Sequence, residues 1–135
     1  MSTDTTDEHA VTVLVAGDPN LDDALRLSGG NLVILDRVTT GNDAINAVLT
    51  ELPDVLLIDV RIEDPDARAV CRRVREWAPA TRVLAATPLD DERAYTTMVA
   101  GASGAIALEA DDDTTLRAVR EIARGESVLL PRVAG

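Results

Sequence analysis

The chain has almost no aromatic residues: one Trp, one Tyr and no Phe among 135 residues. Aliphatic side chains must therefore fill the core, and hydrophobic residues, at 46% of the chain, suffice for one domain. A single cysteine, Cys71, excludes an internal disulfide and suits a reducing compartment. Cys71 falls on the apolar stripe of an expected helix, so we interpret it as a core residue. No apolar run approaches the roughly 20 residues that a membrane-spanning helix needs.

Basic residues are also scarce, with 13 Lys and Arg against 24 Asp and Glu, which gives a formal net charge of −11. A protein of this charge is not expected to bind nucleic acid or an anionic membrane by itself. The first ten residues, MSTDTTDEHA, are predicted to be a disordered acidic tail. They lack the basic start and apolar run of a secretory signal, so we expect a soluble cytoplasmic protein with no membrane partner.

Five short apolar runs, bounded by Gly, Pro, Asn or Asp, are typical of strands buried on both faces. They are VTVLVAG (11–17), LVIL (32–35), VLLID (55–59), RVLAAT (82–87) and AIAL (105–108). Helical spacing of apolar residues predicts helices over 42–52, 66–78 and 90–100, a last helix that ends before Gly125, and a short helix within 18–31. Asp66 and either Asp112 or Asp113 are the expected N-caps.

Alternating strands and helices predict a doubly wound parallel sheet with helices on both faces. Ligands of such sheets bind beyond the carboxyl ends of the strands, where this chain places Asp18, Asp59 and Thr87. Two carboxylates on neighbouring strands repel each other unless a cation or a proton lies between them, and Mg²⁺ suits oxygen ligands of this kind. The alternative is that these residues only cap turns and helices.

The chain also resembles the receiver domain of two-component response regulators, from Val11 to about Val128. The stretches that carry the resemblance are PDVLLIDVRIEDPDARAVCRRVRE (53–76), ATRVLAATPLDDERA (80–94), AGASGAIALEA (100–110) and LRAVREIARGES (116–127). The resemblance implies a flavodoxin-like α/β fold, with a five-stranded parallel sheet of order 2-1-3-4-5 flanked by five helices. It implies a receiver domain over 11–126, after the tail of 1–10. Residues 127–135 would begin a linker to a DNA-binding domain of the NarL/FixJ type that is not in this chain.

Carried over residue by residue, the resemblance places Asp59 at the phosphoacceptor position. The Asp59 carboxylate would attack the phosphoryl group of a kinase phosphohistidine. Asp18, Asp59 and the backbone carbonyl of Arg61 would bind Mg²⁺, and the Thr87 hydroxyl would bind the phosphoryl oxygens.

Three positions depart from the family pattern. Leu108 replaces the family's lysine, which neutralises the phosphoryl group; Gly17 replaces one residue of its acidic pair; and Ala105 replaces its switch aromatic. We therefore expect Mg²⁺ to bind weakly or not at all, and phosphorylation to act weakly as a switch. We also hypothesise that the Arg61 side chain folds back to supply an ion pair to the pocket; the alternative is a solvated arginine.

These observations predict an atypical receiver domain and not an enzyme. It would be the signal-input and dimerisation module of a transcriptional regulator, dimerising through residues 89–124 or through its first and last helices. The expected partners are a histidine kinase, a second copy of the chain, a small-molecule ligand, and DNA only through another domain. One alternative is a stand-alone adaptor that binds a partner protein or a small ligand. Another, a flavodoxin-like cofactor domain, is disfavoured because the loop Gly17-Asp18-Pro19-Asn20 would put a carboxylate against the phosphate.

Overall fold

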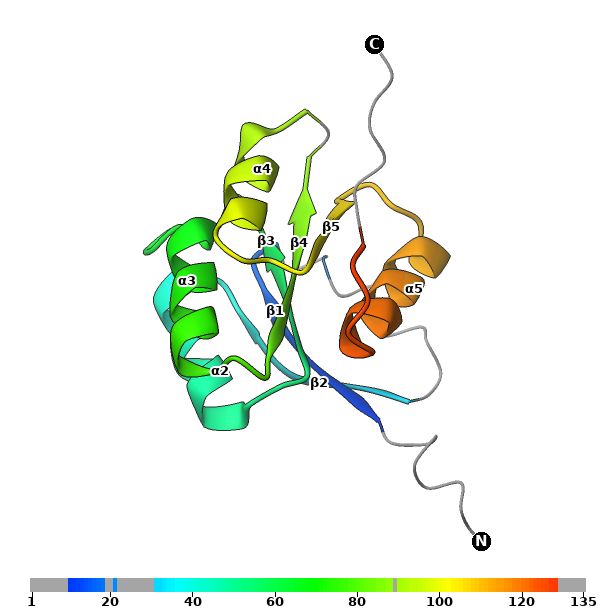
Figure 1. Cartoon of the computed structure of the whole chain (residues 1–135), viewed down its shortest axis with the longest axis horizontal. Helices are drawn as coiled ribbons and strands as arrows, with labels where there is room; N and C mark the ends of the chain where they lie inside the picture. The colour runs from blue at the N-terminus through cyan, green and yellow to red at the C-terminus, as the bar shows by residue number, and fades with distance from the viewer. Residues whose placement is uncertain (1–9, 19–20, 22–30, 89, 129–135) are drawn as a thin grey trace, which may run out of the picture.

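The protein forms a parallel sheet covered by helices on both faces (Figure 1). The computed structural model describes residues 10–18, 21, 31–88 and 90–128. The strands are β1 (Val11–Ala16), β2 (Leu32–Val38), β3 (Val55–Asp59), β4 (Arg82–Thr87) and β5 (Gly104–Ala107). They pair in parallel in the order β2-β1-β3-β4-β5, which confirms the predicted sheet.

Four helices are described: α2 (Gly41–Glu51), α3 (Ala67–Trp77), α4 (Glu92–Val99) and α5 (Asp112–Ala123). In Figure 1, α2, α3 and α4 lie on one side of the sheet and α5 lies on the other. The fifth helix, expected within 18–31, falls almost wholly outside the described residues. The four described helices otherwise match the sequence-based predictions to within a few residues.

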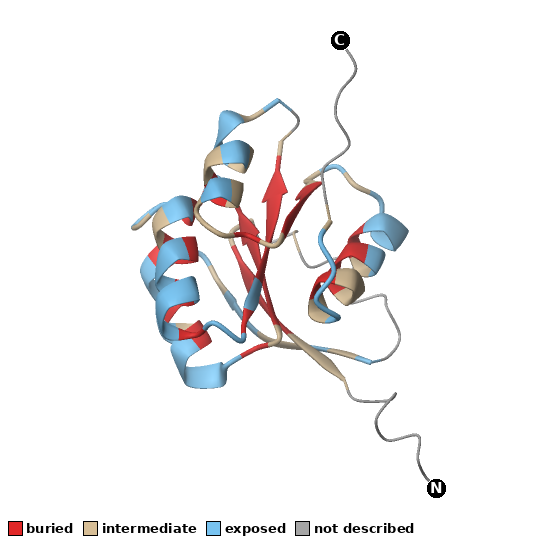
Figure 2. Ribbon diagram, in the orientation of Figure 1, coloured by how far each residue is buried: buried red, intermediate tan, exposed pale blue. Residues whose placement is uncertain are grey.

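The strands are buried because their two faces serve two separate apolar clusters. In β1, Leu14 and Ala16 pack with residues of α2 and α3, whereas Val13 and Val15 pack with residues of α5. Strand β3 is buried along its whole length (Figure 2). This two-sided burial explains why the strand sequences are continuous apolar runs instead of alternating ones.

Each described helix begins at a side chain that accepts a hydrogen bond from the first turn. Thr40 caps α2, Asp66 caps α3 as predicted, and Asp91 caps α4. The prediction for α5 was wrong by one or two positions: Asp111 is the cap, and its carboxylate accepts from the backbone N–H of Thr114 at 2.8 Å. Asp112 and Asp113 lie in the first turn, where negative charge favours the helix dipole.

The two outer strands of the sheet have different surroundings. Beside β5, Val128 forms an isolated parallel bridge with Gly104, and its carbonyl accepts from the N–H of Ala105 at 2.9 Å. On the opposite side, β2 carries exposed Asp36 and Arg37. No helix in the described part of the chain is long and apolar enough to cross a membrane.

Candidate functional site at the carboxyl edge of the sheet

Asp59 is the last residue of β3 and lies at the carboxyl edge of the sheet. Four buried apolar residues precede it, and the Asp59 residue itself is only 3% exposed. The N–H of Val60 donates to Ala86 of the neighbouring strand, and the N–H of Ile62 turns back to the Asp59 carbonyl. The sheet and the turn that follows therefore hold this carboxylate in one place.

The Arg61 side chain folds back onto Asp59, which confirms the hypothesis drawn from the sequence. Its Nε donates to Asp59 Oδ1 at 3.0 Å, and its Nη2 donates to Asp59 Oδ2 at 2.7 Å. The backbone N–H of Arg61 donates to Oδ1 as well, at 2.8 Å. This is the two-pronged geometry in which a guanidinium binds a carboxylate most strongly. The hydrogen bond with Asp59 holds the pKa of Arg61 above its ordinary value, although desolvation opposes the shift.

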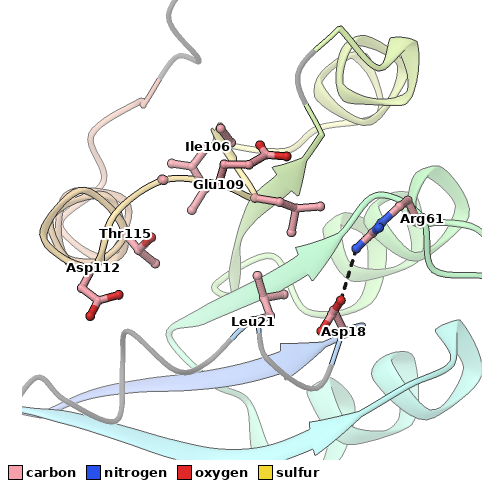
Figure 3. A pocket seen from close by; sticks show the side chains of 10 residues that line it. Asp18, Leu21, Arg61, Ile106, Glu109, Asp112 and Thr115 are labelled. Atoms are coloured by element: carbon pink, nitrogen blue, oxygen red, sulfur yellow. Dashed lines mark hydrogen bonds and ion pairs between the residues drawn. The ribbon is translucent and has the colours of Figure 1, made fainter.

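Asp18 follows β1 and contacts the same guanidinium. Its Oδ2 is 3.5 Å from Arg61 Nη2, the contact drawn as a dashed line in Figure 3. The Asp18 side chain is 38% exposed, against 4% for that of Asp59. One arginine thus contacts both of the carboxylates that the sequence predicted to meet at this edge.

Thr87 ends β4 and is fully buried at the same edge. Its hydroxyl donates to the backbone carbonyl of Pro88 at 2.9 Å. The structure therefore brings Thr87 to the predicted edge of the sheet, with its hydroxyl proton engaged by the chain's own backbone.

Gly17 has no space for a second acidic side chain. Its φ of +130° is disfavoured for residues with a side chain, and a Cβ atom would lie 2.4 Å from the Cβ of Asp59. With this backbone, the acidic pair of the receiver family cannot be accommodated at positions 17 and 18.

A cavity of about 290 Å³ lies between this site and α5 (Figure 3). Its lining includes Asp18, Leu21, Arg61, Leu108 and Glu109. Leu108 stands just after β5, where its N–H donates to the carbonyl of Thr87. The leucine gives the cavity an apolar wall at the position where the resemblance predicts the family's lysine.

Ala105 is buried in the cluster on the α2–α4 side of the sheet. Its side chain is a methyl group, which cannot swing between an inward and an outward position as the switch aromatic expected here from the resemblance would.

A second two-pronged ion pair between an arginine and an aspartate lies at this edge, and the sequence analysis missed it. We call each of these two ion pairs a clamp. Arg93 binds its own helix cap, Asp91, through Nε at 3.0 Å and Nη2 at 2.7 Å. The hydrogen bonds from Arg93 lower the pKa of Asp91 to about 2. The sequence contained a signal that could have predicted it, because Asp91 and Arg93 have the same spacing as Asp59 and Arg61.

The residues present do not fit a resident Mg²⁺ ion. The ion needs carboxylate oxygens at about 2.0–2.1 Å, and the Arg61 cation already binds both oxygens of Asp59, where it would repel the ion. Gly17 supplies no ligand. Within the described ranges, no three His, Cys, Asp or Glu side chains form a group that could hold a metal.

Comparison with known proteins relates the chain to response regulators, although no family model matches it. It is 30% identical over 113 residues to the protein named "Probable transcriptional regulatory protein NarL" of Mycobacterium tuberculosis, covering 83% of this chain and 52% of that protein. It is 36% identical over 101 residues to the transcriptional regulatory protein DegU of Brevibacillus brevis, covering 71% and 42%. The chain thus spans about half the length of the curated relatives it matches.

Solved structures give the same relationship. The signal receiver domain of NarL from Mycobacterium tuberculosis superposes with a TM-score of 0.80 at 28% identity, covering 87% of this chain and 99% of that one. A LuxR-family response regulator from Aurantimonas sp. SI85-9A1 gives a TM-score of 0.80 at 20% identity, covering 90% and 91%. The chain is therefore a homologue of NarL- and LuxR-type two-component response regulators and has the flavodoxin-like fold of their receiver domain.

Proposed function

We propose that the chain is an atypical receiver domain, in which Asp59 keeps the phosphoacceptor position but conventional phosphorylation is weak or absent. The observation that carries the proposal is the arginine on the nucleophile. Both Asp59 oxygens accept hydrogen bonds from Arg61, at 3.0 and 2.7 Å. An oxygen whose lone pairs are engaged by a cation attacks phosphorus less readily, and Arg61 must leave before a donor phosphate can approach in line.

The neighbouring positions support the same conclusion. Leu108 places a hydrocarbon side chain where a lysine would neutralise the transferred phosphoryl group. The loss of one charge-assisted contact of this kind removes about 3 kcal/mol of transition-state stabilisation. Ala105 removes the aromatic side chain whose movement would report phosphorylation.

The relatives support a proposal for the wider role. We propose a cytoplasmic signal-input and dimerisation module of a transcriptional regulator, with a histidine kinase as its upstream partner. DNA would be bound only by a domain outside this chain, since the chain itself carries a net charge of −11. Weak phosphorylation, a small ligand or protein concentration would be its input.

The test is phosphorylation by a small donor. The protein is incubated with acetyl phosphate and MgCl₂ and its intact mass is measured, with Asp59→Asn as the control for labelling elsewhere. We expect at most a small fraction carrying the added phosphoryl mass of about 80 Da. A stoichiometric adduct that Asp59→Asn abolishes would overturn the proposal.

A second candidate is an adaptor that binds a partner protein through α4. Tyr95 and Val99 of α4 are 73% and 69% exposed, beside Arg68 and Arg72 of α3. Exposed large apolar side chains that lie together mark interaction surfaces. Sedimentation of the wild type and of Tyr95→Ser/Val99→Ser separates the two roles. Dimers that dissociate in the variant favour the dimerisation module, whereas a wild-type monomer favours the adaptor.

A further inference from the structure

We propose that Arg61 is a built-in counter-cation that takes the place of a divalent metal ion. The carboxyl edge of the sheet then does not bind a metal ion until Arg61 is displaced. This inference concerns the same site as the proposed function. It is nevertheless independent of phosphorylation, because it describes how the two carboxylates are neutralised at rest.

The first step is that Arg61 already binds the two carboxylate oxygens of Asp59. Asp59 Oδ1 accepts from both the backbone N–H and the Nε of Arg61, and Oδ2 accepts from Nη2 at 2.7 Å. Mg²⁺ bound to Oδ2 at about 2.0–2.1 Å would lie beside the guanidinium nitrogen that the same oxygen holds at 2.7 Å. Two cations this close repel each other, so the ion and the arginine compete for the Asp59 carboxylate.

The second step is charge. Asp18 and Asp59 are the two carboxylates that Arg61 contacts, with Nη2 reaching both, at 3.5 Å and 2.7 Å. The third carboxylate that would favour a divalent ion is missing, because Gly17 lies against Asp59 with no space for a side chain. One fixed monovalent cation therefore offsets much of the repulsion that a metal would otherwise relieve.

The third step is that the clamp is local. Arg93 binds Asp91 with the same spacing and atoms: backbone N–H at 2.9 Å, Nε at 3.0 Å and Nη2 at 2.7 Å. The corresponding distances for Arg61 and Asp59 are 2.8, 3.0 and 2.7 Å. The same geometry thus forms twice in this domain from an aspartate and an arginine two residues later.

The experiment measures metal binding directly. MgCl₂ is titrated into the full chain by calorimetry, and thermal unfolding is followed with and without the ion. We expect the wild type to show no saturable binding and no rise in Tm. Arg61→Ala uncovers Asp59, so it should bind Mg²⁺ at least about tenfold more tightly than the wild type and gain Tm with the ion, since a ligand of the native state stabilises it.

Matched variants keep the result interpretable. Arg93→Ala removes the second clamp and should behave as the wild type does, whereas adding Asp18→Asn to Arg61→Ala should abolish the gained binding. Should Arg61→Ala not fold, Arg61→Lys replaces it: an ammonium cannot bind both oxygens in the planar geometry, so some metal binding should still appear.

The proposal is wrong if the wild type binds Mg²⁺ as tightly as Arg61→Ala, or if no folded Arg61 variant gains binding. Either result leaves the phosphorylation test untouched. Conversely, a wild type that is stoichiometrically phosphorylated but does not bind Mg²⁺ beforehand would overturn the proposed function and leave this inference standing.

Discussion

The guanidinium of Arg61 occupies both carboxylate oxygens of Asp59, the residue two positions before it in the chain. Asp59 is the residue for which the sequence predicts the phosphoacceptor position, and its side chain is only 4% exposed. A buried carboxylate needs a partner, and here the nearest one is part of the same turn. The proposal of an atypical receiver domain therefore rests on this ion pair.

Restoring the missing lysine should recover phosphorylation only when Arg61 is also removed. Leu108→Lys places an ammonium in the cavity next to Asp18 and Arg61, while Arg61→Ala frees the oxygens of Asp59. We expect Leu108→Lys/Arg61→Ala to be labelled by acetyl phosphate and each single variant to be labelled much less, as measured by intact mass. Leu108→Met combined with Arg61→Ala is the control without a charge. An unlabelled double variant that is folded and binds Mg²⁺ would contradict this expectation.

Substitution of Gly17 should destabilise the protein more than substitution of another glycine with positive φ. In Gly17→Ala the residue must keep a positive φ, which is unfavourable for alanine. The new Cβ would also lie 2.4 Å from the Cβ of Asp59, so steric strain adds to the backbone strain. We expect the free energy of unfolding in urea to fall by about 2 kcal/mol or more. Gly125→Ala is the control, because φ is +89° there but the nearest atom, on the Arg82 guanidinium, is 3.4 Å away. Equal losses for the two variants would contradict this account of Gly17.

The Asp91–Arg93 clamp should make stability depend on pH in the acid range. Hydrogen bonds from Arg93 lower the pKa of Asp91 from 3.8 to about 2, so the folded state favours the ionised form. This contribution is complete above about pH 4 and is lost as the pH falls towards 2. The stability advantage of the wild type over Asp91→Asn should therefore shrink between these pH values. The free energy of unfolding in urea, measured at several pH values, tests this. In an Arg93→Ala background the stability difference caused by Asp91→Asn should no longer depend on pH. A wild-type advantage that does not change with pH would contradict the lowered pKa of Asp91.

Cys71 should be unreactive in the native protein. Its side chain is fully buried in the cluster beneath α3, and desolvation raises the pKa of the thiol to about 11. Since the thiolate is the reactive form, a thiol reagent such as DTNB at pH 8 should label the denatured chain but not the native one. Cys71→Ala serves as the blank. Rapid labelling of the native protein would show that α3 opens more readily than this packing indicates.

Much of the fold could be predicted because two-sided burial leaves a strong pattern. The limits of β3 and β4 were predicted correctly, since each is a continuous apolar run that ends at a polar residue. Strand β2 runs to Val38, three residues beyond the predicted run, because an outer strand can carry exposed Asp36 and Arg37. Sequence patterns report burial, so they end where burial ends.

The site could be predicted in position but only partly in its contacts. Topology brings the ends of β1, β3 and β4 to one edge, which placed Asp18, Asp59 and Thr87 together in advance. Whether Arg61 turns inward or lies in solvent depends on its rotamer, which no periodicity records. The Thr87 hydroxyl is a similar case, because its hydrogen bond to the Pro88 carbonyl also depends on the rotamer of the side chain. The phosphoacceptor and metal-binding roles of these residues stay predictions.

The two outer strands also bear on how the protein avoids aggregation. A free strand edge invites pairing with another chain. At β5, Val128 already occupies part of the hydrogen-bonding positions, through Gly104 and Ala105. At β2, a charged pair and a register irregularity beside Val13 make the edge a poor template. Pairing of another strand with either edge is thus disfavoured by the residues that the structure describes there.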